Sequence, residues 1–213
     1  MKHIKGIIFD LDGVLVHTDE LHYQAWKQIA DKAGIPFDRE VNHRLRGVSR
    51  MESLAIILEN DDKNRTDEEK QAMADEKNKL YRNLLKSLTP LSVEPDIRKS
   101  LHALREKGIK LAIGSSSKNA RTILQNIGLS TMFDAVSDGN NITHSKPHPE
   151  VFLLAAQYMG LTPEECTVVE DARAGVDAAV DGGFTCFAMG DAADYGRATH
   201  RIENVKDILD YFD

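Results

Sequence analysis

Residues 7–16 form an apolar run, Ile-Ile-Phe-Asp-Leu-Asp-Gly-Val-Leu-Val, that contains two carboxylates, Asp10 and Asp12. A strand with charged side chains at its carboxyl end is how open α/β sheets build their binding sites. Side chains two positions apart on a strand point the same way, so both carboxylates are expected to face one ligand. Two carboxylates held this close repel each other unless a cation or a proton lies between them. Gly13 then lets the chain leave the strand in a conformation that other residues resist.

From about residue 90 onward, helical and strand patterns alternate along the chain. Strands are expected at 109–113, 135–136, 167–169 and 184–188, and helices at 95–107, 118–127, 150–159, 174–180 and 205–212. Such alternation is typical of a parallel sheet wrapped by helices, and it predicts a Rossmann-like α/β core.

The stretch 17–89, between the first strand and this alternating part, has helical patterns only. Apolar residues at four-residue spacing predict a first helix that ends before Gly34, with Thr18 placed as its N-cap. A short second helix is expected at 51–59. We therefore expect a catalytic core formed by residues 1–16 and 90–213, and an inserted α-helical cap domain at 17–89.

A long helix of the insert begins at a capping box formed by Thr66 and Glu69 and is expected to run to about residue 88. Lys77 falls on the apolar stripe predicted for this helix, whose other members are Met73, Leu80, Leu84 and Leu88. A lysine in such a stripe usually extends its ammonium group to solvent. The alternative is that Lys77 lines a polar cavity between two layers, and the residues alone leave both interpretations open.

Composition restricts the classes of partner. The chain has 213 residues and a formal net charge of −7, which argues against nucleic acid or an acidic membrane surface as the main partner. It has no apolar segment long enough to span a bilayer and no N-terminal signal pattern, so we expect a cytoplasmic protein. We also expect a monomer. Cys166 and Cys186 lack the spacing of a metal site and are expected to be buried, reduced thiols.

Polar residues also follow the strand expected at 109–113. The segment 114–119, Gly-Ser-Ser-Ser-Lys-Asn, opens a helix, and the free N–H groups at a helix start bind anions. Ser117 taken alone could equally be a simple helix cap. Lys146, beside Pro147, precedes another expected helix, and in isolation it would be an ordinary loop residue.

Glu170 and Asp171 end the strand expected at 167–169. Acidic residues at a helix start can simply complement the helix dipole. At the same sheet edge as Asp10 and Asp12, however, they are expected to be ligands of a cation. Hard carboxylate oxygens suit Mg²⁺, which binds substrate phosphates through few protein ligands.

Together these residues predict phosphoryl transfer. Asp10 could attack phosphorus to give an aspartyl-phosphate, and Asp12 could protonate the departing oxygen. Ser115 and Lys146 would hold the other phosphate oxygens. The large acceleration that phosphate-ester cleavage requires would come mainly from positioned charge.

These motifs, Asp10-Leu-Asp12-Gly, Ser115, Lys146-Pro147 and Glu170-Asp171, resemble in type and order those of the haloacid dehalogenase-like superfamily over nearly the whole chain. An aspartate at position 12 is similar to the phosphatase and phosphomutase branches. The resemblance implies that Asp10 is the nucleophile and Asp12 the acid and base. It also implies a Mg²⁺ ion held by Asp10, the Asp12 backbone carbonyl, Glu170 and Asp171.

The insert resembles the β-phosphoglucomutase family at Thr18, His22, 25–27, 46–50, 52–54, 77–78 and 117–119. That family interconverts β-glucose 1-phosphate and glucose 6-phosphate through β-glucose 1,6-bisphosphate. The resemblance implies a hinge at Thr18 and support of Asp12 by His22. It further implies a substrate-binding set made of Trp26, Arg46, Gly47, Val48, Ser49, Arg50, Lys77, Ser116, Ser117, Lys118 and Asn119. Within this set Arg50, Ser117 and Asn119 would hold the phosphate that is not reacting, and residues 47–49 and Lys77 would contact the sugar.

Two other functions stay open at this stage. The first is a sugar-phosphate phosphatase with the same cap, in which water rather than a sugar hydroxyl discharges Asp10. The second is a binding protein that has lost catalysis, which the intact reacting groups argue against. Some positions depart from the family pattern: His17 stands where an acid is usual, Ser116 where a small apolar residue is usual, and Arg46 where a lysine is usual.

Overall fold

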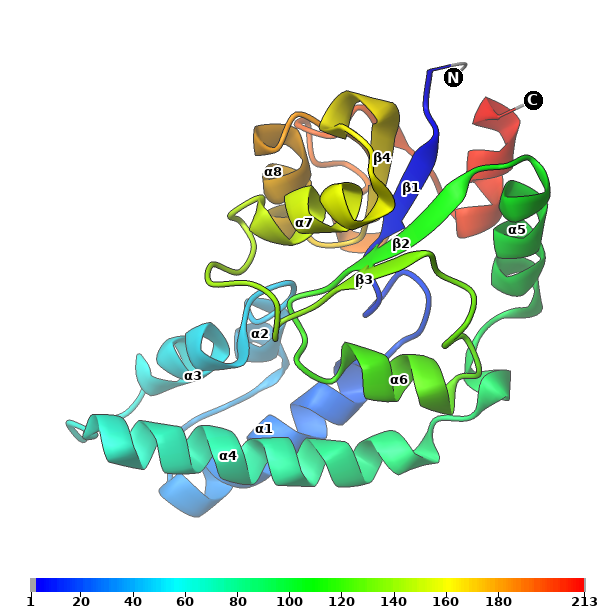
Figure 1. Cartoon of the computed structure of the whole chain (residues 1–213). Coiled ribbons are helices and arrows are strands. Elements are labelled where there is room, and N and C mark those ends of the chain that lie inside the picture. Colours follow the sequence, from blue (N-terminus) through cyan, green and yellow to red (C-terminus); the bar gives the residue numbers. More distant parts are fainter. Residues whose placement is uncertain (1–2, 213) are drawn as a thin grey trace.

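A six-stranded parallel sheet forms the centre of the protein (Figure 1). The structure is a computed structural model that describes residues 3–212. The strands follow the order β3-β2-β1-β4-β5-β6, so the direction of winding reverses between β1 and β4, where sheets of this kind bind ligands. Their bounds are β1 Gly6–Phe9, β2 Lys110–Gly114, β3 Ala135–Ser137, β4 Cys166–Glu170, β5 Thr185–Ala188 and β6 His200–Arg201. The expected Rossmann-like fold is confirmed.

Helices cover both faces of this sheet. Ile7 and Phe9 of β1 point into one apolar cluster, and Ile8 between them points into the other. A parallel sheet that is buried on both faces needs strands that are apolar throughout, and β1 has no polar residue. The first face packs against α5 Pro95–Glu106, α6 Ala120–Asn126 and the 3-10 helix η5 Val205–Tyr211, and the second against α7 Glu150–Met159 and α8 Arg173–Asp181.

The insert between β1 and α5 is helical (Figure 1). It has an apolar cluster of its own, built around Trp26, Leu54 and Ala74, whose members all lie within residues 23–80. Tyr81 and Leu85 instead join the cluster of the core. Because the end of the insert packs on the core, the division into a core of residues 1–16 and 90–213 and a cap of residues 17–89 remains a proposal. The elements are α1 Asp19–Ala33, α2 Arg39–His43, α3 Arg50–Leu58 and α4 Asp67–Leu84, followed by the 3-10 turns η1 Leu85–Ser87 and η2 Pro90–Ser92.

Some boundaries differ from the expected ones. The first strand ends at Phe9, and the chain then turns back so that Asp12 and Val16 form an isolated bridge. The expectation that Asp12 belongs to the strand is therefore wrong. The helix expected at 205–212 is a 3-10 helix. Neither α2 nor β6 was expected, because elements of five and two residues are too short to show a periodic pattern.

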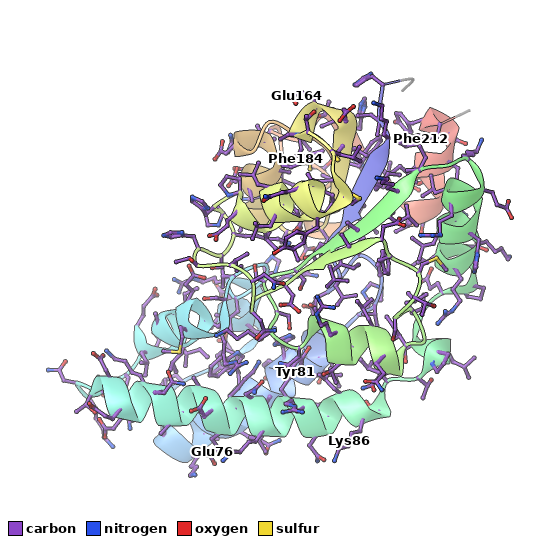
Figure 2. The ribbon with its side chains drawn as sticks, viewed as in Figure 1. Glu76, Tyr81, Lys86, Glu164, Phe184 and Phe212 are labelled. Carbon is purple, nitrogen blue, oxygen red and sulfur yellow. The ribbon has the colours of Figure 1, made fainter. Side chains whose placement is uncertain are left out.

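The buried face of α4 is shifted by one position from the expected stripe. The buried residues of α4 are Ala74, Lys77 and Tyr81, and Leu85 of η1 continues this face. The expected residues Met73, Leu80, Leu84 and Leu88 are only partly buried. Figure 2 shows Tyr81 on the inner side of this helix and Glu76 on its outer side, with Lys86 of η1 also on the outer side. Lys77 is only 3% exposed, so the interpretation in which it reaches solvent is wrong.

Two expectations from composition can be compared with the structure. Cys166 and Cys186 are buried free thiols, as expected, and burial raises the pKa of Cys166 to about 12. Within residues 3–212, no helix combines the length and apolar character that crossing a membrane requires.

Replacement of Leu54 by Ala tests the proposed division of the chain. Leu54 is fully buried in the insert cluster, so Leu54→Ala should lower the free energy of unfolding of the insert by about 2–5 kcal/mol. Limited proteolysis should then cut first within 17–89 and leave the sheet protected. Met51→Ala, on the same helix but 44% exposed, is the control and should change little. If the insert and the sheet of Leu54→Ala lost their protection from proteolysis at the same time, the proposed division would be contradicted.

Candidate active site

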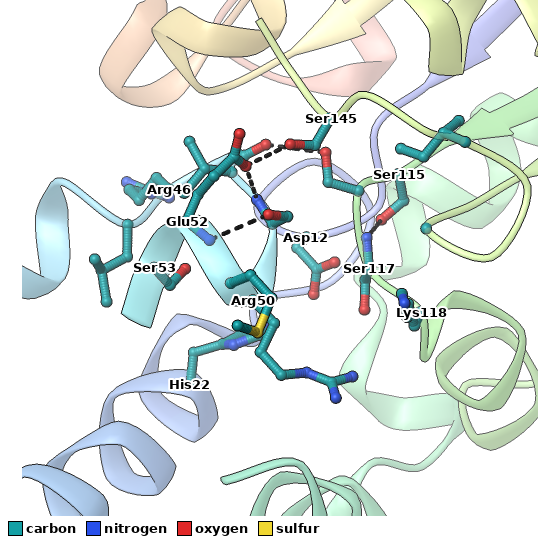
Figure 3. A pocket seen from close by; sticks show the side chains of 18 of the residues that line it. Asp12, His22, Arg46, Arg50, Glu52, Ser53, Ser115, Ser117, Lys118 and Ser145 are labelled. Carbon is teal, nitrogen blue, oxygen red and sulfur yellow. Dashed lines mark hydrogen bonds between the residues drawn. The ribbon is translucent and has the colours of Figure 1, made fainter. Parts of the chain in front are cut away.

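A cavity of about 870 Å³ lies between the carboxyl ends of the central strands and the helical insert (Figure 3). Its size suits a small-molecule ligand. The predicted site residues that line it are Asp10, Asp12, His22, Trp26, Arg46, Gly47, Val48, Ser49, Arg50, Lys77, Ser115, Ser116, Ser117, Lys118, Asn119 and Asp171. Three others lie behind its wall: Thr18 contacts Asp12, while Lys146 and Glu170 lie beside Asp10.

Asp10 and Asp12 reach the cavity from the turn that follows β1. The backbone N–H of Asp10 still donates to the carbonyl of Val169, at 2.9 Å, which holds it against β4. Gly13 has a φ of +98°, and a Cβ on it would lie 2.1 Å from Asp171 Oδ2. The turn therefore needs glycine both for its conformation and for its close approach to Asp171. Both aspartates line one cavity because of this turn, and not because they share a strand.

Lys146 forms the buried link between Asp10 and Glu170. Its Nζ lies 2.5 Å from Asp10 Oδ1 and 2.5 Å from Glu170 Oε1, and the side chain is fully buried. Burial alone would lower the pKa of this lysine, but the two carboxylates raise it more, so the ammonium stays charged. Glu170 Oε2 accepts hydrogen bonds of 2.8 Å from the N–H groups of Asp171 and Ala172. The buried charges are thus paired and held in one geometry.

Burial raises the pKa of the carboxylates at this end of the cavity more than their cationic neighbours lower it. Desolvation raises the pKa of Asp10, against the effect of Lys146, and the neighbouring carboxylates raise it further. Desolvation and Glu170 raise the pKa of Asp171 to about 8. Asp10, Asp171 and Glu170 offer only hard oxygen donors, which is the set that Mg²⁺ prefers. The residues present therefore fit a Mg²⁺ ion.

Gly175 makes room for Glu170. It lies in the first turn of α8, and a Cβ at this position would come within 1.8 Å of Glu170 Oε1. The absence of a side chain at Gly175 therefore lets α8 approach the Glu170 carboxylate closely.

The side chain of Thr18 forms a hydrogen bond with Asp12 rather than with the backbone of its own helix. It occupies the N-cap position of α1, but its side chain makes no capping hydrogen bond and its hydroxyl donates to Asp12 Oδ1. The expected cap is therefore wrong. Desolvation raises the pKa of Asp12, and the hydrogen bond from Thr18 opposes that rise.

Tyr81 is a cavity residue that the sequence analysis missed. Its hydroxyl is buried and has no hydrogen-bond partner within residues 3–212. Desolvation and the nearby Asp12 raise its pKa, so it stays a neutral phenol. The available signal was its position four residues after Lys77, which places both side chains on one face of α4.

His22 and Lys77 form a pair inside the cavity. Lys77 Nζ lies 2.8 Å from His22 Nδ1 and stands over the rings of Tyr81 and Trp26, at 4.5 and 4.9 Å from their centroids. Burial and then the charge of Arg50 lower the pKa of Lys77 to about 7. Burial and Lys77 hold the pKa of His22 well below its usual range. His22 is therefore neutral, and its Nδ1 can accept a hydrogen bond from Lys77.

The insert contacts the core across the cavity. Side-chain hydrogen bonds connect Ser116 Oγ to the Gly47 carbonyl at 3.0 Å, Asn119 Nδ2 to Asn78 Oδ1 at 3.0 Å, and Ser145 Oγ to Glu52 (Figure 3 shows the last). Each joins a loop at the sheet edge to a helix or loop of the insert. The insert therefore closes over the carboxylates.

Arg46 also crosses from the insert to the core. Its Nη2 lies 2.7 Å from Asp171 Oδ2 and 2.7 Å from Asp19 Oδ2, and its Nη1 contacts Asp191. These carboxylates raise the pKa of Arg46 against the effect of its partial burial. Its guanidinium is thus engaged by acids, one of which is an expected metal ligand.

Arg50 contrasts with Arg46 because it has no such partner. It is half-buried, lines the cavity, and makes no hydrogen bond or ion pair within residues 3–212. Burial lowers its pKa, opposed only by the more distant Asp75. In Figure 3 its guanidinium extends towards the side of the cavity that holds Ser117 and Lys118. Arg50 is therefore a partly desolvated cation that is free to bind an anion.

The serine loop after β2 is ordered by its own hydroxyl groups. Ser115 Oγ accepts from the Ser117 N–H at 3.1 Å, and Ser117 Oγ accepts from the Asn119 N–H at 3.2 Å. Asn119, not Ser117, occupies the N-cap position of α6. The hydroxyl hydrogens of both serines remain available to a ligand.

Comparisons with known proteins identify a matching family, similar proteins and a similar solved structure. Residues 4–183 match the model of the haloacid dehalogenase-like hydrolase family. The chain is 41% identical over 189 residues to a β-phosphoglucomutase of Bacillus subtilis, covering 88% of this chain and 83% of that protein. It is 37% identical to a fructose-1-phosphate phosphatase of Escherichia coli, covering 82% and 90%. The crystal structure of a β-phosphoglucomutase from Clostridium difficile superposes with a TM-score of 0.92 at 36% identity, covering 98% and 97%.

Replacement of Gly175 by Ala should break the Lys146–Glu170 pair. The added Cβ would displace the Glu170 carboxylate, and breaking a buried ion pair costs about 3–5 kcal/mol. The measurement is the free energy of unfolding in urea. Gly196→Ala, which meets open space, is the control and should stay within about 0.5 kcal/mol of the parent. Equal stability of the two variants would contradict this account of Gly175.

Replacement of Lys77 by Met should stabilise the protein in a pH-dependent way. The pKa of Lys77 is about 7 when folded and about 10.5 when unfolded, so between these values the unfolded chain binds more protons. The destabilisation caused by Lys77 therefore grows as the pH falls from about 10.5 to 7 and is constant below. Lys77→Met should raise the free energy of unfolding by about 1–4 kcal/mol at pH 7 and by less near pH 9.5.

Urea unfolding at both pH values measures this gain. Lys79→Met, at an exposed position of the same helix, provides the control. A gain for Lys77→Met that does not vary with pH would refute the lowered pKa of Lys77.

Proposed function

The chain belongs to the haloacid dehalogenase-like hydrolase family, and we propose that it is a Mg²⁺-dependent phosphomutase that interconverts β-D-glucose 1-phosphate and glucose 6-phosphate through β-glucose 1,6-bisphosphate. The observation that carries this proposal is the unpaired, half-buried guanidinium of Arg50 in the cavity. A bisphosphate needs an anion site at each end, and a planar guanidinium suits the second phosphate. A phosphatase that acts on a monophosphate has no need of this second site.

Asp10 is the proposed nucleophile. One of its oxygens forms a bond to phosphorus as the bond from phosphorus to the leaving oxygen breaks, which gives an aspartyl-phosphate. Lys146, at 2.5 Å from Asp10, favours the ionised form that this attack requires, and Ser115 would bind a phosphate oxygen. Asp10, the Asp12 backbone carbonyl, Glu170 and Asp171 would hold the Mg²⁺, which supplies neutralisation of the phosphate charge when it is bound.

Asp12 is the proposed general acid and base. Its raised pKa suits donation of a proton to the leaving oxygen, and it would take a proton from the sugar hydroxyl in the return step. Thr18 donates a hydrogen bond to Oδ1, which fixes the orientation of the carboxyl group. His22 would support Asp12 as a neutral imidazole. In this role Thr18 orients a reacting group as well as standing at the start of the insert.

The far end of the cavity is the proposed site for the phosphate that is not reacting. Arg50, Ser117 and Asn119 would hold it, with Lys118 beside them at the cavity wall. Residues 47–49 and Lys77 would contact the sugar, and Trp26 would provide an apolar surface. An anionic substrate near Lys77 would favour its charged form, because a nearby opposite charge raises the pKa of an amine.

Closure of the insert is the proposed means of excluding water from the aspartyl-phosphate. The hydrogen bond from Ser116 to the Gly47 carbonyl supports this, and it uses the hydroxyl by which Ser116 departs from the family pattern. Arg46 adds an ion pair between the insert and Asp171. His17 is exposed and is not among the residues that line the cavity, so we assign it no role in the reaction.

A sugar-phosphate phosphatase is the second candidate. The observation that favours it is the 37% identity to a fructose-1-phosphate phosphatase. The same reacting groups would serve, with water in place of the sugar hydroxyl.

Phosphorus NMR distinguishes the two reactions. The protein is incubated with Mg²⁺, β-glucose 1-phosphate and a trace of the 1,6-bisphosphate. Accumulation of glucose 6-phosphate supports the mutase, whereas release of inorganic phosphate alone contradicts it in favour of the phosphatase. Asp10→Asn should abolish both reactions.

Replacement of Arg50 by Ala should separate the two activities. Loss of a charge-assisted contact to the second phosphate should lower the mutase kcat/KM by roughly 10- to 100-fold. Hydrolysis of a small monophosphate should change by less than about threefold. Arg44→Ala is the control, since Arg44 is an exposed arginine of the insert that pairs with Glu59. Equal losses of both activities in Arg50→Ala would argue against a second phosphate site.

A further inference from the structure

Two histidines and a glutamate gather on the exposed loop that carries Lys146. His144 and His148 precede α7, and Glu150 is its first residue. One ligand atom from each of the three lies within 4.8 Å of the other two. The two imidazole rings are 4.8 Å apart between centroids, and His144 Nδ1 lies 3.3 Å from Glu150 Oε2. His144 and His148 also line the cavity described above, but the cluster shares no residue with the carboxylates around Asp10.

The loop backbone already orients the cluster. The Glu150 carboxylate accepts hydrogen bonds from the N–H groups of Thr143, at 3.0 Å, and His144, at 2.7 Å. The N–H of Glu150 in turn donates to His148 Nδ1 at 3.3 Å. Both imidazoles therefore turn Nδ1 towards Glu150, whose carboxylate is held at the start of the helix. A carboxylate fixed in this way is ready to accept a cation.

The donor set indicates which kind of cation fits. Two imidazole nitrogens and one carboxylate oxygen suit borderline divalent ions such as Zn²⁺ or Ni²⁺, whereas Mg²⁺ prefers oxygen ligands only. Bonds of about 2.0–2.1 Å to such an ion require the donor atoms to move closer together than they lie here. His144 and His148 are exposed, so their rings can turn inward without disturbing packed neighbours. Exposure also leaves room for water to complete the coordination.

We propose that His144, His148 and Glu150 bind one divalent transition-metal ion, at a site separate from the proposed Mg²⁺ site. The segment between the two histidines contains Ser145 and Lys146, which contact Glu52 of the insert and Asp10 of the core. An ion that links His144 to His148 would bridge the two ends of the loop segment that contains Ser145 and Lys146. Its expected effect is to restrain the loop that joins the insert to the nucleophile.

Titration with Zn²⁺ tests the site. Isothermal titration calorimetry is performed on the full-length, untagged protein in excess Mg²⁺, so that the oxygen site is filled. The parent should bind one Zn²⁺ per chain, and His144→Ala or His148→Ala should weaken binding at least about tenfold. His102→Ala, an exposed histidine of α5, is the control and should bind as the parent does. Unchanged binding in the double variant of His144 and His148 would overturn the proposal.

A spectroscopic measurement tells this site from the carboxylates. Cu²⁺ bound in the presence of excess Mg²⁺ should show nitrogen hyperfine coupling in its electron paramagnetic resonance spectrum, because two ligands are imidazoles. Circular dichroism verifies that each variant is folded. Bound Cu²⁺ without nitrogen coupling in the parent would place the ion on oxygen ligands and refute the assignment.

Discussion

The buried contact of Lys146 with Asp10 and Glu170 is the interaction on which the rest of the site depends. It joins the end of β1, the end of β4 and the loop before α7 through charges that are removed from water. Such a group is stable only while it is complete, because one buried charge without its partner is strongly unfavourable. Gly175 is required by the same contact, since only the absence of a side chain there leaves space for Glu170.

The insert supplies most of the cationic side chains that line the cavity. At the end of the cavity that holds Asp10, the core contributes carboxylates and the buried Lys146, and the insert contributes cationic groups that line the cavity, among them Arg50 and Lys77. Lys77 is held among aromatic rings and beside a neutral histidine, so its charge is costly when the cavity holds no anion. Arg46, by contrast, is neutralised by acids of both parts. The two arginines therefore differ in what they can offer a ligand, although only three residues separate them.

Much of the fold and of the site could be predicted because local chemistry determines it. Apolar strands with polar ends predicted where Asp10, Ser115 and Glu170 would meet, and the capping box at Thr66 predicted the start of α4. The errors arose where a side chain had a distant partner. The hydroxyl of Thr18 bonds to Asp12 instead of its helix, and the buried face of α4 is shifted by one residue because Tyr81 and Leu85 pack on the core.

The sequence by itself determined the parallel α/β architecture, the order of the motifs and the oxygen-rich character of the site, because these follow from periodicity and from the residue types at strand ends. Only the tertiary structure decided which charges are paired. Whether Lys77 reaches solvent and whether Arg50 has an acidic partner both depend on side chains that come from distant parts of the chain. The physical reason is that desolvation and Coulomb energy depend on distances in space, which spacing along the chain does not specify.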